Sequence, residues 1–276
     1  MDGGSRPEGL GTGTGPSNAP QATLGQIDVD KSLYVAMTGA KDILDAQAVN
    51  NFNLANASTT GFKADLAAFQ SQAVAGSGYA SRVYATASIA GWDQSQGALQ
   101  TTNVPLDVAV QGQGYIAVQG PNGQEAYTRN GDLHLTPEGL LVTSTGQAVL
   151  GDNGPISLPP SSSIKIGEDG TITVLPFGAP AQSLATVGRI KLVNPPPDTL
   201  VRQGGGLFQL AAAGTDTAPA DATVKLTSGV LESSNVDLAG AMVNMIDLSR
   251  NFELQVKAMK SADENAQASS QLLQPT

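Results

Sequence analysis

Residues 235–273 read NVDLAGAMVNMIDLSRNFELQVKAMKSADENAQASSQLL, and this stretch decides the fold. Alternating steps of four and three residues from Leu238 fall on apolar residues at most positions. The series is Leu238, Met242, Met245, Ser249, Phe252, Val256, Met259, Asp263, Ala266, Ser270 and Leu273. A repeat of 3.5 residues predicts a long helix that winds around another helix. At 1.5 Å per residue this helix would reach roughly 55 Å, which is too long for one small domain to cover.

A second series of this kind lies near the other end of the chain. The same steps from Leu33 give Leu33, Met37, Ala40, Leu44, Gln47, Asn51 and Leu54. We expect Asp30 or Ser32 to cap this helix, and a Ser/Thr cluster followed by Gly61 to end it after about Asn56. The two chain ends are therefore predicted to meet as paired helices. Two separate amphipathic surface helices are the alternative.

Composition excludes several classes of protein. A chain of 276 residues holds one or two domains with real cores. Its net charge of −10 argues against nucleic acid as a partner, since phosphate binding needs clustered Lys and Arg. The absence of cysteine excludes disulfides and thiolate metal sites. No run of about 18 apolar residues occurs, so we expect no membrane insertion.

The remaining segments differ in character. Residues 1–28 are rich in Gly, Pro, Ser and Thr, which predicts a disordered leader. Residues 29–72 and 232–276 are assigned to a terminal helical domain, in which 64–72 form a further short helix. Residues 73–103 are expected to be an extended connector. We expect the C-terminal helix to be capped at Ser234 or Asn235, with Asp237 in its first turn.

Residues 104–231 are predicted to be rich in β-strands. Leu106, Val108 and Val110 alternate with other residues, and turn pairs such as Asn130-Gly131 follow at short intervals. This pattern is typical of a sandwich or open barrel, with further strands at 187–193 and 207–211. The predicted fold class is α+β: a discontinuous helical coiled-coil base from both termini with an inserted all-β domain.

Catalytic chemistry has no support in the sequence. Residues 112–117 (GQGYIA) match part of a dinucleotide fingerprint, but strand alternation continues where that motif needs a helix, so a tight turn or bulge is expected. His134 is the only histidine and falls at an outward strand position. Residues 168–171 (EDGT) lack a calcium loop and predict a hairpin turn. We expect no catalytic, cofactor or metal site, and no enzyme.

Both ends of the chain carry a recognisable set of motifs. Residues 32–40 (SLYVAMTGA) and 53–63 (NLANASTTGFK) resemble the N-terminal signature of bacterial flagellar rod and hook proteins. Residues 234–237 (SNVD) with 241–247 (AMVNMID) are similar to that family's C-terminal signature. The resemblance covers essentially residues 29–273.

Three further stretches resemble the proximal-rod member of the family more than its distal-rod or hook members. They are residues 64–69 (ADLAAF), 188–195 (GRIKLVNP) and 247–253 (DLSRNFE). A distal-rod or hook protein remains the first alternative, and a secreted β-domain enzyme or adhesin the second. Two departures stand out. Phe52 occupies a place where a small or polar residue is expected, and the leader precedes Val29, which we expect to be the true start.

The resemblance implies a structural subunit of the periplasmic rod in the flagellar basal body. It also implies export by the flagellar type III apparatus, self-association, and contacts with other proximal and distal rod proteins through the terminal helices. The residues expected at subunit contacts are Leu33, Met37, Ala40, Leu44, Leu54, Asn56, Gly61, Phe62, Leu238, Met242, Met245, Phe252, Val256, Met259 and Leu273.

Overall fold

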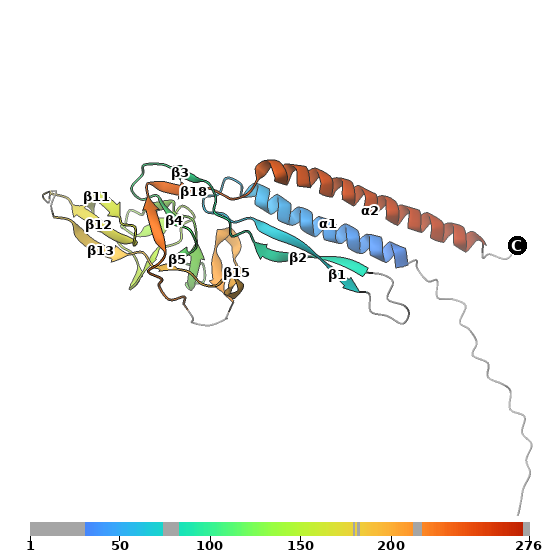
Figure 1. Ribbon diagram of the computed structural model, residues 1–276, viewed down its shortest axis with the longest axis horizontal. Coiled ribbons are helices and arrows are strands. Elements are labelled where there is room, and N and C mark those ends of the chain that lie inside the picture. The colour runs from blue at the N-terminus through green and yellow to red at the C-terminus, as the bar shows by residue number, and fades with distance from the viewer. Residues whose placement is uncertain (1–30, 74–82, 179, 181–182, 212–216, 273–276) are drawn as a thin grey trace, which may run out of the picture.

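The computed structural model describes residues 31–73, 83–178, 180, 183–211 and 217–272. The predicted leader (1–28), Asp30 and Leu273 lie outside the described residues. Two helices and a long hairpin form an elongated stalk, and the other strands form a β module at one end of it (Figure 1). The α+β class is confirmed, with the helices drawn from both ends of the sequence.

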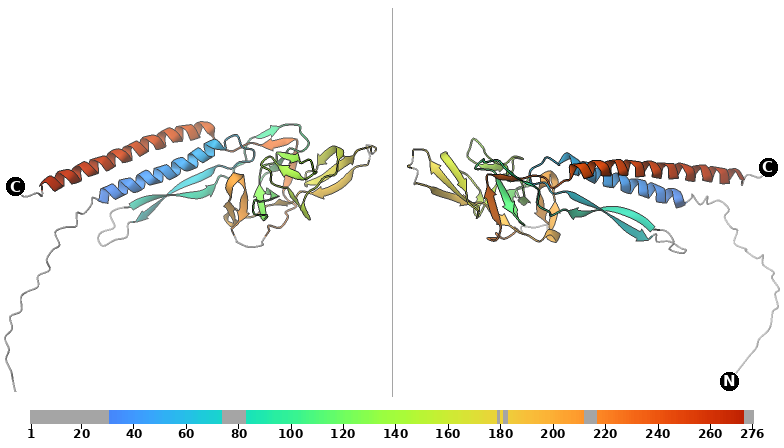
Figure 2. Two further views of the ribbon diagram at one scale, coloured as in Figure 1. Left: turned by 180° about the vertical axis from the view of Figure 1, so that it is seen from behind. Right: turned by 45° about the horizontal axis from the view of Figure 1, so that its top comes forward.

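The stalk has three layers. Its elements are α1 (Lys31–Ala55), α2 (Leu238–Leu272), β1 (Asp65–Ala73) and β2 (Val83–Trp92). Helix α1 lies between α2 on one side and the antiparallel β1–β2 hairpin on the other (Figure 2). The helices run antiparallel, because Asn50 late in α1 donates a hydrogen bond to the carbonyl of Ala241 early in α2. With 35 residues, α2 is about 52 Å long.

The prediction of a short helix at 64–72 is wrong, because these residues form most of β1. The side-chain amide of Asn53 acts as a strand neighbour for the first residue of β1. It donates to the Asp65 carbonyl and accepts from the Asp65 N–H, both at 2.8 Å. The remaining backbone groups pair with β2, a partner that local sequence does not reveal. Tertiary pairing therefore overrides the local preference.

The prediction that Ser234 or Asn235 caps α2 is also wrong. Helix α2 begins at Leu238, and Asp237 is the N-cap, with its Oδ1 accepting a hydrogen bond from the Ala239 N–H at 3.1 Å. At the other helix, Ser32 lies inside the first turn of α1 and so is not its N-cap.

The β module spans residues 99–232. Its strands are β3 (Leu99–Thr101), β4 (Val108–Gln111), β5 (Tyr115–Gln119), β6 (Glu125–Thr128), β7 (Leu133–Leu135), β8 (Leu141–Thr143), β9 (Leu150–Gly151), β10 (Gly154–Pro155), β11 (Ser161–Ile166), β12 (Thr171–Pro176), β13 (Ala185–Arg189), β14 (Leu192–Val193), β15 (Leu200–Arg202), β16 (Phe208–Leu210), β17 (Lys225–Ser228) and β18 (Val230–Glu232). The strand predicted at 187–193 is thus two short strands.

The strands pair as small antiparallel sheets around one main apolar core. The largest sheet has the order β14-β5-β6-β16-β15, and a second has the order β11-β12-β13. Buried Ile116, Leu141 and Ile172 lie at the centre of the core. The β11–β12 connection confirms the predicted turn at 168–171. Strand pairs β3–β18 and β4–β17 bring the entry and exit of the module together.

Candidate subunit interfaces and the joint between stalk and β module

The face of α2 that packs on α1 repeats every seven residues. Among the described positions of α2 from Ala241 onward, the buried or half-buried ones are Ala241, Met245, Leu248, Phe252, Gln255, Met259 and Ala262. The series predicted from the sequence shares Met245, Phe252 and Met259 with this face. It differs at the alternate positions, because the helix is turned so that Leu248 packs inward where Ser249 was expected. The sequence predicted the seven-residue period of this face. It placed every second position one residue too far along the helix, at Met242, Ser249 and Val256 instead of Ala241, Leu248 and Gln255.

The half of α2 nearer the β module also carries large apolar side chains outside this face, and these are exposed. They are Leu238, Met242, Val243, Ile246, Leu254 and Val256, each 41–59% exposed. Leu238, Met242 and Val256 flank the face against α1, while Val243 and Leu254 lie on the opposite side. Large exposed apolar side chains on more than one side of a helix are typical of a surface that contacts other proteins.

Helix α1 shows the same division. Ala36, Ala40, Ile43 and Ala46 are buried against the neighbouring elements. A Cβ built at Gly39 would lie 3.2 Å from the Gln255 side chain, so α1 and α2 approach closely there. The exposed apolar residues of α1 are Tyr34, Met37, Leu44 and Phe52.

The predicted contact residues therefore divide into groups with different surroundings. Met37, Leu44, Leu238, Met242 and Val256 are exposed. Leu33, Leu54, Asn56, Met245, Phe252 and Met259 are half-buried. Ala40, Gly61 and Phe62 are buried inside the monomer, so contacts within their own chain already account for them.

Gly61 and Phe62 belong instead to the joint, which we define as residues 56–64, 93–98 and 233–237. The backbone N–H of Gly61 donates to the Glu232 carbonyl at 2.7 Å, which ties the chain after α1 to the last strand of the module. Gly61 has a φ of 68°, and a Cβ there would lie 2.3 Å from the Arg129 carbonyl carbon. Both the conformation and the close approach require glycine.

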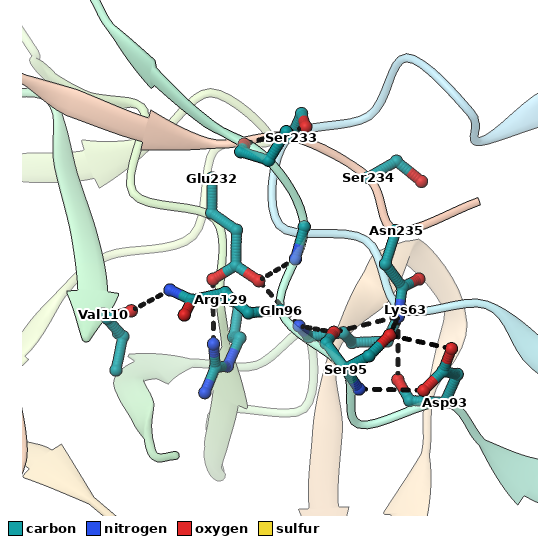
Figure 3. A network of polar contacts seen from close by, with 12 residues as sticks. Lys63, Asp93, Ser95, Gln96, Val110, Arg129, Glu232, Ser233, Ser234 and Asn235 are labelled. Atoms are coloured by element: carbon teal, nitrogen blue, oxygen red, sulfur yellow. Dashed lines mark hydrogen bonds and ion pairs between the residues drawn. The ribbon is translucent and has the colours of Figure 1, made fainter. Parts of the chain in front are cut away.

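A buried carboxylate holds the joint together (Figure 3). Glu232 at the end of β18 pairs with Lys63 Nζ at 2.6 Å and with Arg129 Nη1 at 2.8 Å, and the three side chains are 1–4% exposed. Glu232 also accepts a hydrogen bond from the Gly97 N–H. Lys63 donates in addition to the Ser95 carbonyl. Four separate parts of the chain thus converge on one ion cluster.

Desolvation decides the electrostatics of this cluster. Burial lowers the pKa of the Lys63 ammonium, and the hydrogen bond and charge of Glu232 act in the opposite direction. A buried ion is tolerated only when its partners satisfy it, so loss of one partner would leave an uncompensated charge. Arg129 also donates to the carbonyls of Gly112 and Gly114, which fixes the glycine turn between β4 and β5. That turn confirms the structural interpretation of residues 112–114.

Three residues of the β module that contact the joint were missed in the sequence: Glu232, Arg129 and Arg202, of which Arg202 donates a hydrogen bond to the Lys63 carbonyl. Lys63 is the last residue of the N-terminal signature, and Glu232 lies two residues before the C-terminal one. This closeness to the two signatures is the signal in the sequence that could have indicated Glu232. Nothing in the local pattern marks the two arginines, because each reaches the joint from a part of the module that is distant in the sequence: Arg129 directly after β6 and Arg202 at the end of β15.

The described residues also bear on metal binding and membrane insertion. Within them, no group of three or more His, Asp or Glu side chains is placed to hold a metal ion. His134 is 60% exposed and lies 3.0 Å from Asp132, as expected for a surface histidine. No helix in the described part of the chain has the length and apolar character needed to cross a membrane.

Comparison with known proteins gives a consistent result. Residues 227–272 match the family model of the flagellar basal body rod FlgEFG protein C-terminal region, and 109–174 match the FlgE/F/G D1 domain of flagellar hook proteins. The chain is 44% identical to the flagellar basal-body rod protein FlgF of Escherichia coli (strain K12) over 249 residues, covering 89% of this chain and 99% of that protein. The same values hold for FlgF of Salmonella typhimurium (strain LT2).

The match extends to a related rod protein at lower identity. The flagellar basal-body rod protein FlgG of Buchnera aphidicola subsp. Schizaphis graminum is 35% identical over an alignment of 270 positions. The alignment covers 87% of this chain and 99% of that protein. With its helical ends, its inserted β module and near-full-length matches of this kind, the chain belongs to the family of flagellar basal-body rod proteins.

Proposed function

We propose that the chain is a structural subunit of the proximal part of the flagellar rod, and that it assembles through the exposed apolar faces of α1 and α2. Its place in the basal-body rod follows from the family. The 44% identity to FlgF over 89% of the chain supports the proximal position. The single observation that carries the mode of assembly is the set of large apolar side chains on α2 that face away from α1.

Two faces of α2 are available to other helices. Leu238, Met242 and Val256 border the face against α1, so a helix of a neighbouring subunit can extend that packing as a coiled coil. Val243 and Leu254 point away from it and fit a second neighbour. Burying the exposed half of one Leu or Met side chain stabilises by about 1 kcal/mol, so the combined faces can hold a subunit in place.

The partners in this proposal are other copies of the chain and the neighbouring proximal and distal rod proteins. Delivery by the flagellar type III export apparatus fits a chain without cysteine, which can refold outside the cytoplasm without disulfide chemistry. Loss of secretion in a strain with an inactive export apparatus would support this route. Secretion at the normal level in that strain would refute it.

The assembly proposal is tested at Met242, which is 50% exposed in the monomer. The Met242→Asp variant should fold normally and fail to enter the rod, because assembly would bury its charge. Met242→Leu is the matched control and should be incorporated. Rod incorporation of Met242→Asp at the wild-type level would overturn the proposal. Met259 faces α1, so Met259→Asp reports on the fold of the monomer instead.

A position in the distal rod is the second candidate, favoured by the 35% identity to the Buchnera FlgG protein. Electron microscopy of basal bodies from a strain lacking the gene separates the two. A rod that stops below its distal segment supports the proximal position. A rod that ends later supports a distal position, and an intact flagellum would contradict both.

A further inference from the structure

Arg202 links the β module to the stalk through aromatic rings. Its guanidinium carbon lies 4.3 Å from the ring centroid of Phe62, 5.4 Å from that of Phe52 and 5.6 Å from that of Phe208. Phe52 belongs to α1, Phe62 to the joint and Phe208 to β16, so one cation contacts three parts of the molecule. Phe52 and Phe62 also meet edge to face, with centroids 5.6 Å apart.

The polar contacts of Arg202 also join the β module to the stalk. Its Nη1 donates to the Lys63 carbonyl at 2.7 Å and pairs with the Asp65 carboxylate at the start of β1. Within the described residues, its buried Nε and Nη2 make no hydrogen bond. The aromatic rings take the place of those acceptors, because the face of an aromatic ring attracts a cation.

Lys63 belongs to both ionic contacts of the joint. Its carbonyl accepts from Arg202, and its ammonium pairs with Glu232, which in turn pairs with Arg129. Arg202 ends β15 and Arg129 directly follows β6, and the two hold the same short segment of the joint through different groups. A hinge motion at the joint would have to break at least one of these contacts.

We propose that the two clamps, Arg202 with Phe52 and Phe62, and Glu232 with Lys63 and Arg129, form a rigid coupling that fixes the angle between stalk and β module. Phe52 is the part of this coupling that α1 contributes. A small or polar residue expected at position 52 would leave one side of Arg202 without a ring. The coupling lets a single subunit transmit twist between its two parts, and it does not depend on which neighbours the subunit has.

The test measures, in the full-length monomer, the distance between stalk and β module, which changes when the angle between them changes. Because the chain has no cysteine, Arg250→Cys on α2 and Lys165→Cys on β11, both exposed, take spin labels without other changes. Pulsed electron paramagnetic resonance then gives the distribution of distances between stalk and β module. We expect one narrow distribution in the otherwise wild-type chain.

Breaking the clamps should broaden this distribution. We expect Phe52→Ser and Glu232→Gln each to widen it at least twofold at temperatures where circular dichroism shows the variant folded. Phe177→Ser removes an aromatic side chain that is 70% exposed in the β module, and this control should leave the width unchanged. If Phe52→Ser does not fold, Phe52→Leu keeps most of the volume without the aromatic ring and takes its place.

Two results would overturn the coupling. One is a broad distribution in the wild-type chain. The other is an unchanged width in folded variants of both clamps, which would assign Phe52 and Glu232 to stability alone. Neither result bears on assembly of the rod, which Met242→Asp tests separately.

Discussion

The side-chain carbonyl oxygen of Asn235 accepts a hydrogen bond from the backbone N–H of Ala64 at 2.7 Å, although 171 residues separate the two. The amide nitrogen of Asn235 donates to the carbonyls of Asp93 and Ser95, each at 3.0 Å. One side chain of the C-terminal signature therefore holds together the segments that leave α1 and that enter the β module. The segment after α1, the entry to the β module and the segment before α2 are therefore joined within a single chain.

Replacing Asn235 by Ala should lower the free energy of unfolding by about 1–3 kcal/mol, because partly buried backbone groups lose their partners. Urea denaturation followed by circular dichroism measures the change. Asn244→Ala is the control, since Asn244 is exposed on α2. Its effect should stay within about 0.5 kcal/mol. Equal losses in the two variants would contradict the role given to Asn235.

Gly61 and Gly123 form a matched pair that separates backbone strain from steric clash. Both have positive φ, 68° and 73°, but a Cβ at Gly123 would meet nothing within 4 Å. Gly123→Ala should therefore cost only the conformational penalty of about 1–2 kcal/mol. Gly61→Ala should cost clearly more, because its Cβ would clash with the backbone of Arg129. Thermal unfolding measures the stability of both variants. Equal losses of stability would show that the backbone of the joint shifts to accommodate the added Cβ.

Tyr127 should make the protein sensitive to alkali. Its hydroxyl accepts a hydrogen bond from the Ala218 N–H at 2.7 Å, and burial raises its pKa to about 12 from an ordinary 10.0. The folded state then holds this proton more tightly than the unfolded state. The contribution of protonated Tyr127 to the free energy of unfolding is fully present below pH 10 and is lost as the pH rises from 10 to 12.

Unfolding free energies measured between pH 8 and 12 test this. Tyr127→Phe should show a shallower decline above pH 10 than the wild-type chain. Some decline should remain, because burial also raises the pKa of Tyr115. Parallel pH profiles for the variant and the wild type would exclude Tyr127 as the source.

Asp237 should hold the first turn of α2. Its carboxylate caps the helix through the Ala239 N–H, so Asp237→Ala should cost about 1 kcal/mol. Hydrogen exchange of the amides at 239–241 should speed up in this variant. Asp247→Ala, at an exposed position inside the helix, is the control and should leave these amides unchanged. Unchanged exchange in Asp237→Ala would mean that packing alone holds the turn.

The sequence by itself determined the helical ends, the inserted strands and the family. Period and turn chemistry are local properties: a seven-residue repeat along α2 and pairs such as Asp169-Gly170 act within a few residues of themselves. The signatures around Gly61 and Asn235 could be recognised for the same reason. A repeat does not state which of two adjacent positions faces inward, and so Leu248 was missed in favour of Ser249.

Only the tertiary structure decided what depends on partners far along the chain. Residues 65–73 became a strand because β2 and the Asn53 amide satisfy their backbone groups. Glu232, Arg129 and Arg202 came to contact the joint because strand pairing in the β module carries them to Lys63. A buried charge is stable only where its partners converge, and that convergence is a property of the folded chain rather than of any segment in it.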